Sequence, residues 1–337
     1  MAMEYLKVHV CSLIYANLWH QWAVWKLQKE GSEDKIPILI RAHRPTATQR
    51  ANHALWQLGN GQISLEDVLR EFGARSENSW ALFAPRWCEV PNDVETLGTW
   101  MKGTEDPKIK EDKILHRLEN EMKNLPVKMR AKMRIVQQYL YLREEQRFSF
   151  ERLLLLWKES WIWIEKQAGF PIRHLLKTEI ESFQKGMLPQ AKEIAEQRQK
   201  EWSDVVLEWK KIGAPPQFLL GDQILVQGDK SDVCTGIGIS QGYAEGRVRI
   251  VRTLQDASTL EEGDILFVTT LDPGWTPLLL KAGGMVMELG GMLSHGAVIA
   301  REYRVPAVAA LEGACTHFVE GAHVALDGQA GTVWNCS

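Results

Sequence analysis

The sequence predicts a two-domain protein: an all-helical N-terminal domain over residues 1–212 and a mixed α/β domain over residues 236–337, joined by a linker over residues 213–235. Long helical patterns with few glycines dominate the first 212 residues. Beyond the linker, glycines become frequent and short β-type runs appear, such as Val248–Val251 and Ile265–Val268. A length of 337 residues leaves room for two hydrophobic cores.

The linker contains the turn-forming run Gly213–Pro216 and a polar stretch from Gly221 to Ser231. Such a segment is typical of an ordinary connection between domains. It would equally serve as a hinge if the C-terminal domain has to move.

Tryptophan is concentrated in the N-terminal part, which holds twelve of the chain's 14. Two groups recur at helical spacing: Trp19, Trp22 and Trp25, and Trp157, Trp161 and Trp163. We expect most of these rings to form core, and some to line a cleft for a flat or bulky apolar acceptor. The segment Val8–Trp25 is apolar but too polar to span a membrane, and we expect a buried or amphipathic helix there.

Charge and cysteine content exclude several classes of function. The 40 basic and 43 acidic residues give a net charge of −3, which argues against a nucleic-acid partner bound through charge. The five cysteines form no Cys-x-x-Cys pair and no cluster with histidine, so the sequence indicates neither a zinc site nor a disulfide framework. We expect no metal ligands in this chain, no membrane contact and a cytoplasmic location.

One histidine, His295, stands where a phosphoryl group can be carried. The apolar run Met285–Met287 is typical of a short buried strand, and the pair Gly290 and Gly291 ends it. Ser294 is a good helix N-cap, which puts His295 in the first turn of a helix. Unpaired backbone N–H groups and the positive end of the helix dipole favour an anion there. A neutral imidazole in that position is a nucleophile, although a capping histidine near the surface has the same local sequence.

The segment from Gly290 to Val308 closely resembles the swivelling phosphohistidine domain of phosphoenolpyruvate synthase, pyruvate phosphate dikinase and rifampin phosphotransferase. The shared elements are the glycine pair, the hydroxyl residue before the histidine, a helix that ends in Ala300-Arg301-Glu302, and the strand entry Pro306-Ala307-Val308. The resemblance implies that His295 is phosphorylated and that the glycine pair and Ser294 support the phosphate. It also implies that the C-terminal domain is a swivelling β/β/α phosphohistidine domain.

Further segments resemble the same domain in order along the chain. Residues Gly236–Gly242 with Ala244–Val248 look like its first hairpin, Thr269–Leu278 like its central strand and loop, and Glu320–Val333 like its closing hairpin. In the family the central loop lies near the histidine. The resemblance therefore makes three hydroxyl residues candidates to hydrogen-bond the imidazole or the phosphate: Thr269, Thr270 and Thr276.

Two positions depart from the family pattern. Gly296 follows the histidine where most relatives have Ala or Thr, which costs some helix propensity. Arg304 stands near the helix exit where most relatives have Gly. Neither departure removes a group that phosphorylation needs, but both leave room for a different acceptor or partner.

Two segments of the N-terminal part resemble rifampin phosphotransferase and its relatives, in which a helical acceptor domain comes before the histidine domain. One runs from Leu65 to Trp87, and it has Ala74 where the family commonly has His. The other is the helix Leu142–Arg147, preceded by Asn124–Pro126.

These two segments hold four arginines that are candidates to bind the acceptor or the transferred phosphoryl group: Arg75, Arg86, Arg143 and Arg147. A guanidinium fork suits phosphate oxygens, and phosphoryl transfer depends on positioning and on stabilisation of charge. For the last two arginines, a helix face of salt bridges is the alternative.

The sequence has no Gly-x4-Gly-Lys-Ser/Thr phosphate loop, no Gly-x-Gly-x-x-Gly after a strand, and no counterpart of the nucleotide-binding domain of rifampin phosphotransferase. We therefore expect one component of an ATP-dependent phosphotransferase. A separate ATP-binding subunit, which also holds Mg²⁺, charges His295, and His295 passes the phosphoryl group to an acceptor oxygen of a small molecule on the helical domain. Alternatives are one piece of a larger enzyme, or a non-catalytic phosphocarrier or regulatory subunit that docks a protein through its tryptophan-rich helices.

Overall fold

The computed structural model describes residues 2–212, 219–220, 223–224, 233–253, 256–292 and 294–336. The chain forms two compact units: unit 1 combines Met1–Arg152 with Gly228–Ser337, and unit 2 is Leu153–Gln227. Most of the predicted linker over residues 213–235 lies outside the described residues. Its role as a hinge and the domain boundaries therefore stay predictions.

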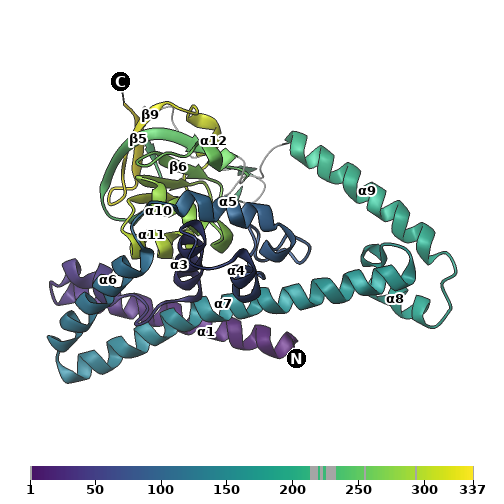
Figure 1. The fold of residues 1–337 in the computed structure, drawn as a ribbon, viewed down its shortest axis with the longest axis horizontal. Coiled ribbons are helices and arrows are strands. Elements are labelled where there is room, and N and C mark those ends of the chain that lie inside the picture. The colour runs from purple at the N-terminus through teal and green to yellow at the C-terminus, as the bar shows by residue number, and fades with distance from the viewer. Residues whose placement is uncertain are drawn as a thin grey trace. The chain divides into compact units, whose positions relative to one another are not determined.

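The N-terminal part of unit 1 is helical, as predicted (Figure 1). Its helices are α1 (Ala2–Lys29), α2 (Ile36–Leu39), α3 (Ala47–Gly59), α4 (Leu65–Phe72), α5 (Pro91–Met101), α6 (Pro107–Lys123) and the first part of α7 (Val127–Ala168). Short 3-10 helices, Glu33–Lys35 and Trp87–Glu89, precede α2 and α5. Helix α1 covers the segment expected to be helical, and none of the described helices is both long and apolar enough to cross a bilayer.

Capping explains where several of these helices begin. Thr46 and Gln49 form a reciprocal capping box at the start of α3, and Ser64 and Asp67 form another at the start of α4. Helices α5 and α6 begin with proline, whose missing N–H is not needed in the first turn. Buried side chains of α3, α4 and α5 then pack into one core, which α7 joins through Phe148, while α1, α2, α6 and α7 form a second core.

Unit 2 contains the C-terminal part of α7, the 3-10 helix Ile172–His174, α8 (Lys177–Gln184), α9 (Ala191–Ile212) and the antiparallel pair β1 (Leu219–Leu220) and β2 (Gln223–Ile224). Its core is small and consists of Phe170, Ile172, Leu175, Ala191 and Ala195, with partly buried side chains around them.

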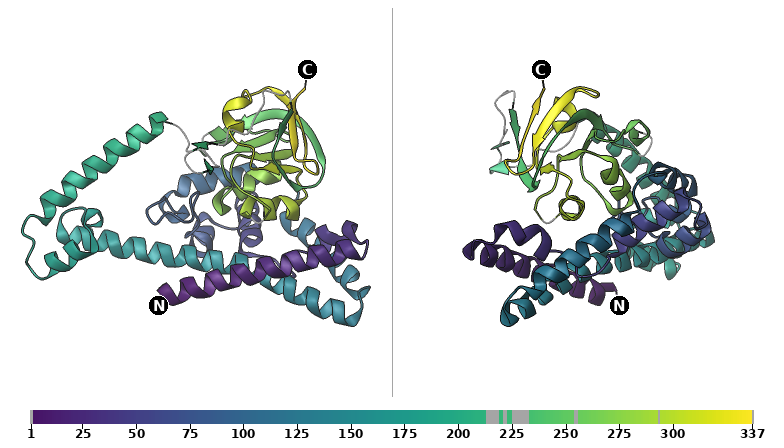
Figure 2. Two further views of the ribbon diagram at one scale, coloured as in Figure 1. Left: turned by 180° about the vertical axis from the view of Figure 1, so that it is seen from behind. Right: turned by 60° about the vertical axis from the view of Figure 1, so that its left-hand side comes forward.

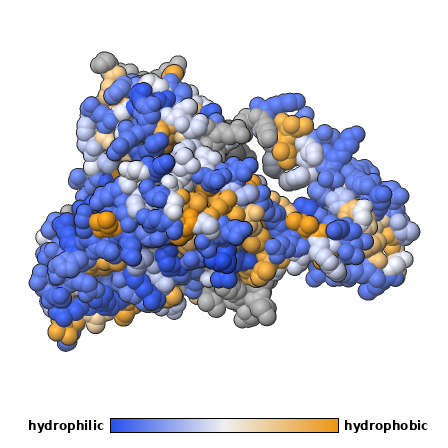
Figure 3. All heavy atoms as spheres, in the orientation of Figure 1, coloured by the Kyte–Doolittle hydropathy of each residue, from blue (hydrophilic) through white to orange (hydrophobic). Residues whose placement is uncertain are grey.

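Half of the twelve N-terminal tryptophans are exposed: Trp25, Trp80, Trp157, Trp163, Trp202 and Trp209. The other half are buried or packed against a core: Trp19, Trp22, Trp56, Trp87, Trp100 and Trp161. The expectation that most of them form core is therefore wrong. Helix α9 contributes few residues to a core, and its Trp202 and Trp209 pack edge to face on each other, with ring centroids 6.1 Å apart. The face of the molecule in Figure 3 is largely hydrophilic, with separate apolar patches.

The C-terminal part of unit 1, coloured green to yellow in Figure 2, is built around a mixed eight-stranded sheet. Its strand order is β3-β10-β9-β5-β6-β7-β8-β4. The strands are β3 (Val233–Thr235), β4 (Ile237–Ser240), β5 (Tyr243–Ile250), β6 (Ile265–Val268), β7 (Gly284–Met287), β8 (Ala307–Ala309), β9 (His323–Asp327) and β10 (Thr332–Asn335). Neighbours from β5 to β8 are parallel, and the other pairs are antiparallel.

Helices cover both faces of this sheet. Leu266 and Val268 of β6 join a core with α10 (Thr276–Lys281) and α11 (His295–Tyr303), whereas Ile265 and Phe267 join a core with α12 (Ala314–His317) on the opposite face. A helical N-terminal part followed by an α/β C-terminal part confirms the predicted fold class.

Of the two hairpins expected in the sheet, one forms. Strands β9 and β10 pair antiparallel, with Thr332 opposite Asp327, which confirms the closing hairpin. The first hairpin is wrong, because β4 pairs with β8 while β5 pairs with β6 and β9. Gly242, between β4 and β5, has φ +133°, and its carbonyl accepts a hydrogen bond from the N–H of Gly328 after β9. The chain is thereby turned toward β9 instead of back onto β4.

The segment Thr269–Leu278 was expected to include the central strand of the sheet, but it begins just after that strand. Strand β6 ends at Val268, and a loop, the 3-10 turn Pro273–Trp275 and the start of α10 follow. Two prolines in this segment, Pro273 and Pro277, lack the N–H that a central strand would need.

Candidate functional site

His295 is the first residue of α11, after the loop that leaves β7. The Ser294 side chain accepts a hydrogen bond from the N–H of Ala297 (3.3 Å), so Ser294 caps the helix. Gly290 has φ +128°, a conformation that residues with side chains rarely adopt. The strand, the cap and the helix start predicted around His295 are therefore confirmed.

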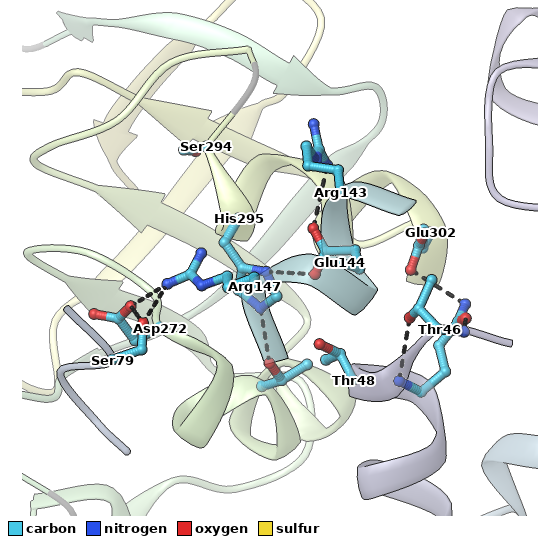
Figure 4. A network of polar contacts seen from close by, with 12 residues as sticks. Thr46, Thr48, Ser79, Arg143, Glu144, Arg147, Asp272, Ser294, His295 and Glu302 are labelled. Atoms are coloured by element: carbon cyan, nitrogen blue, oxygen red, sulfur yellow. Dashed lines mark hydrogen bonds and ion pairs between the residues drawn. The ribbon is translucent and has the colours of Figure 1, made fainter. Parts of the chain in front are cut away.

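The imidazole of His295 is buried and contacts two side chains from other elements (Figure 4). Its Nδ1 lies 3.2 Å from Oε2 of Glu144 on α7, and its Nε2 lies 3.3 Å from Oγ1 of Thr276 on α10. Glu144 and Thr276 are buried as well. Within unit 1, the histidine of the sheet domain therefore meets a carboxylate of the helical part.

The surroundings favour a neutral imidazole and an ionised carboxylate. Burial lowers the pKa of His295, and the charges of Arg147 and Arg75 act in the same direction, against the opposing effect of Glu144. Burial alone would raise the pKa of Glu144, but His295, Arg143 and Arg147 hold it below its ordinary value.

The charge of Glu144 favours one tautomer of the histidine. An ionised carboxylate oxygen 3.2 Å from Nδ1 favours the proton on Nδ1, although the two atoms are not aligned as a hydrogen bond. The lone pair then stays on Nε2, to which the hydroxyl of Thr276 can donate. Nε2 is therefore the nucleophilic atom of His295 in this arrangement.

A second polar cluster lies beside the histidine. Nη2 of Arg147 donates to Oγ of Ser79 (2.7 Å) and pairs with Asp272, and Oγ of Ser79 donates to Oδ1 of Asp272 (3.1 Å). Asp272 belongs to the loop after β6, so this cluster also joins the helical part to the sheet domain. Arg143, four residues before Arg147 on α7, lies with its Nη2 3.4 Å from Oε1 of Glu144.

Two hydrogen bonds between α3 and α11 join the same two parts. Nε2 of Gln49 donates to Oε2 of Glu302 (3.1 Å), and Nδ2 of Asn52 donates to the hydroxyl of Tyr303 (2.9 Å). All four side chains are buried. The sheet domain is therefore in contact with the helical part at both ends of α11.

The groups around His295 line a cavity of about 810 Å³, a size typical of small-molecule sites. The helical part contributes Glu77, Asn78, Trp80, Arg143, Glu144 and Arg147, and the sheet domain contributes Val251, Arg252, Thr269, Thr270, Leu271, Asp272, Trp275, Ser294 and His295. The two tryptophans, Trp80 and Trp275, add large rings to this polar lining. Among the residues that the structure describes, no group of three or more His, Cys, Asp or Glu is arranged to hold a metal ion.

The four predicted arginines fall into two pairs. Arg143 and Arg147 line the cavity. Arg75 does not line it, but lies fully buried with Nη1 3.3 Å from Oε2 of Glu151, and it acts on the histidine through its charge. Arg86 is also buried and donates to backbone carbonyls of its own loop. A direct role in binding the acceptor stays a prediction for all four.

The three predicted threonines lie near one another. Thr276 contacts the imidazole, and Thr269 and Thr270 line the cavity. The Thr269 hydroxyl donates to Oε2 of Glu288 (2.9 Å). At Gly291 an added Cβ would meet no atom within 4 Å, so the backbone before Ser294 is open to an approaching group.

Packing explains Gly296, one of the two departures from the family pattern. A Cβ at Gly296 would lie 2.6 Å from Sδ of Met287 and 3.0 Å from Cβ of Leu271. The first turn of α11 therefore packs directly on β7 and on the loop after β6. The other departure, Arg304, ends α11 in a left-handed conformation (φ 56°, ψ 37°), which glycine adopts more easily.

Three residues of the site were not predicted from the sequence: Glu144, Ser79 and Asp272. In the sequence, the spacing of the charged residues on α7 suggests that they pair with one another along the helix. Instead Glu145 pairs with Arg50 of α3 (3.0 Å) and Arg147 with Asp272, so the charges connect different elements. A usable signal was present, because Glu144 stands between two candidate arginines that are one helical turn apart.

Comparison with known proteins gives one family. Residues 260–331 match the mobile domain of PEP-utilising enzymes. Rifampicin phosphotransferase of Bacillus cereus is 25% identical over 299 residues, which cover 80% of this chain and 34% of that protein. The Bacillus subtilis protein of the same name is 38% identical over 126 residues (36% of this chain, 14% of that protein). Phosphoenolpyruvate synthase of Aeropyrum pernix is 37% identical over 100 residues (29% of this chain, 12% of that protein).

The chain spans about a third of the length of the Bacillus cereus relative, and a smaller share of the other two. The residues matched by the family include β6, α10, β7 and α11, and so contain His295. This result confirms the family predicted from the glycine–histidine segment: residues 260–331 are similar to the mobile domain of PEP-utilising enzymes, and the three relatives above are named rifampicin phosphotransferase or phosphoenolpyruvate synthase.

Proposed function

We propose that this chain is the acceptor-side component of an ATP-dependent phosphotransferase, in which His295 carries the phosphoryl group. The observation that supports this most is the buried contact of His295 with Glu144 beside a cavity of about 810 Å³. A carrier histidine needs a nucleophilic nitrogen, a partner that holds its tautomer, and space for an acceptor. The groups around His295 support all three requirements.

In the charging step, Nε2 of the neutral imidazole attacks a phosphoryl group of ATP. A P–O bond to the leaving phosphate oxygen breaks and a P–N bond to Nε2 forms, while Nδ1 keeps its proton. We assign ATP and its Mg²⁺ to a separate ATP-binding subunit, because the sequence contains no phosphate-loop motif. His295 is buried against α7, so the sheet domain has to leave the helical part in order to reach ATP.

In the transfer step, an acceptor oxygen attacks the phosphorus, the P–N bond breaks, and its electron pair returns to Nε2. A hydroxyl acceptor releases its proton to water. Arg143 and Arg147, which line the cavity, would stabilise the charge on the transferred oxygens. A carboxylate with a lowered pKa is a poor base, so Glu144 holds the Nδ1 proton and stabilises the positive ring rather than deprotonating the acceptor.

We infer that the acceptor is a small molecule with a bulky, partly apolar body and a reactive hydroxyl or carboxylate oxygen. Trp80 and Trp275 in the cavity lining support an apolar body, and the polar groups near His295 support an oxygen as the acceptor atom. A carrier that only docked a protein would need no cavity of this size beside its histidine. The cavity therefore favours catalysis over a regulatory role.

Phosphorylation of His295 tests this function. The chain is incubated with ATP, Mg²⁺ and candidate ATP-binding proteins encoded near it, and its peptides are analysed by mass spectrometry without acid. We expect one phosphate on His295 in the wild type and none in His295→Ala. His317→Ala, which changes an exposed histidine on α12, is the matched control and should be labelled like the wild type.

Two results would contradict the proposal. One is an unlabelled wild type with every candidate that consumes ATP. The other is a His295 phosphate that no small acceptor removes, which would favour the non-catalytic carrier instead.

A further inference from the structure

A second cavity, of about 430 Å³, adjoins the first at Arg143, which lines both. The helical part contributes residues such as His20 of α1 and Arg117 of α6. The sheet domain contributes residues of β4 and α11. The proposed function makes no use of this cavity.

Positive charge dominates its lining, which contains five arginines but only two carboxyl groups, those of Asp34 and Glu302. Among the residues that the structure describes, three of these arginines have no carboxylate within ion-pair distance: Arg117, Arg301 and Arg304, here called the unpaired arginines. Arg117 and Arg304 are exposed, and Arg301 also donates to the backbone carbonyls of Ile239 (3.1 Å) and Met292 (2.6 Å). Burial raises the pKa of Glu302 to about 8, so this carboxyl is largely uncharged at neutral pH and does not balance them.

Arg304 reaches this cavity from a strained backbone position. It ends α11 at φ +56°, and only one other described residue besides glycine, Ala310, has a positive φ. The left-handed region is unfavourable for a residue with a Cβ, and such strain is common at ligand sites. Glycine would fit this backbone conformation better, but arginine places a guanidinium group at the cavity.

Two further observations favour an anion in this cavity. Arg41 lines the cavity and is buried; its Nη2 pairs with Glu111, but its Nε donates no hydrogen bond to any residue that the structure describes. Burial lowers the pKa of Arg304, and the charges of Arg117 and Arg41 lower it further. Like charges of the helical part and of the sheet domain therefore face each other across the cavity.

The remaining lining is apolar and includes Ile38, Leu140 and Val298. A ligand that fits both kinds of lining has an apolar group and a compact anionic group. We propose that this second cavity binds an organic phosphomonoester, with its dianion among the unpaired arginines and its apolar group against these three side chains. Guanidinium groups bind phosphate oxygens through pairs of charge-assisted hydrogen bonds.

This ligand would bridge two parts of the molecule. Arg117 belongs to the helical part, whereas Arg301 and Arg304 belong to the sheet domain. Without an anion their charges oppose docking, and with it the docked arrangement is stabilised. The phosphomonoester therefore controls how long His295 stays beside the acceptor cavity, a consequence that rests on the proposed function.

Isothermal titration calorimetry with 1-naphthyl phosphate, on the full chain at constant ionic strength, tests the site. We expect it to bind more tightly than either of its halves, inorganic phosphate and 1-naphthol. Arg304→Gly and Arg117→Gln should each weaken binding about tenfold or more, because each removes charge-assisted contacts. Glycine suits the backbone at residue 304, so Arg304→Gly should fold. The matched control is Arg70→Gln, an exposed arginine of α4, which should bind like the wild type.

Equal binding by the wild type and both cavity variants would overturn the proposal. So would a failure of 1-naphthyl phosphate to bind, or binding of 1-naphthol as tight as that of the phosphomonoester. Binding by His295→Ala should match the wild type. This control separates binding at the second cavity from the phosphorylation of His295.

The bridging step has its own readout, the rate at which diethyl pyrocarbonate modifies His295, followed by mass spectrometry. The ligand should slow this modification several-fold in the wild type and leave it unchanged in Arg304→Gly. An unchanged rate in the wild type at saturating ligand would overturn the bridging step.

Discussion

The sheet domain and the helical part contribute to the site in different ways. The sheet domain supplies the reacting atom, Nε2 of His295, on a capped helix that begins beside glycines. The helical part supplies charge, through Glu144 and Arg147 on α7 and the buried Arg75 behind them. Against α7 the imidazole is buried and its pKa is lowered; away from α7 it loses both the burial and the carboxylate. A moving histidine therefore has different chemistry at each place it visits.

The largest effect should come from breaking the charge network of the helical part at its deepest point. Arg75 and Glu151 are both fully buried, 3.3 Å apart at their closest atoms. Arg75→Met leaves the Glu151 carboxyl without its partner, and breaking such a buried pair costs about 3–5 kcal/mol of the free energy of unfolding. Urea unfolding followed by far-UV circular dichroism should show this loss.

The cost of Arg75→Met should grow with pH. Burial raises the pKa of Glu151 to about 7, so the stability it contributes is present below its unfolded pKa and is lost as the pH rises through about 7. Without Arg75 the pKa of Glu151 rises further, and variant and wild type should differ more at about pH 8 than at about pH 6. The double variant Arg75→Met/Glu151→Leu should recover most of the stability; no recovery would rule out the ion pair as the cause.

A smaller effect, on rate, is expected where the two parts meet. Glu144→Gln keeps the shape of the side chain and removes its charge, so the transfer of phosphate from His295 to an acceptor or to water should slow about 100-fold. Glu144 acts on His295 only while the histidine lies against α7, so charging by the ATP-binding subunit should keep its wild-type rate in this variant. Single-turnover measurements of charging and of transfer would separate the two steps. Glu145→Gln, one residue along α7 and paired with Arg50, should change neither rate.

The smallest effect is expected on the side of the sheet domain. Ser294→Ala removes the N-cap of α11 and should cost about 1 kcal/mol in thermal unfolding. Ser64→Ala removes the corresponding cap of α4 and should cost a similar amount, but only Ser294→Ala should also slow the labelling of His295. Equal labelling of both variants would mean that the cap matters for folding alone.

Local signals account for what could be predicted from the sequence. Strand β7, the Ser294 cap and α11 depend on residues within one short stretch, and all three were predicted correctly. The strands on both sides of Gly242 were also expected, but their partners, β8 and β9, lie far along the chain, and the hairpin assigned to them was wrong. Glu144, Ser79 and Asp272 come from three distant segments. They meet because the sheet domain packs on α7, and no local pattern records that contact.

The hydrogen bonds and ion pairs that join α11 and the loop after β6 to the helical part also affect how fast the sheet domain separates from it. Gln49 with Glu302, Asn52 with Tyr303, and Arg147 with Asp272 are all polar pairs whose members water can satisfy once they separate. Contacts of this kind resemble those of short-lived protein complexes. We therefore expect the release of the sheet domain, and not the breaking of the P–N bond, to limit the number of phosphoryl groups delivered per second.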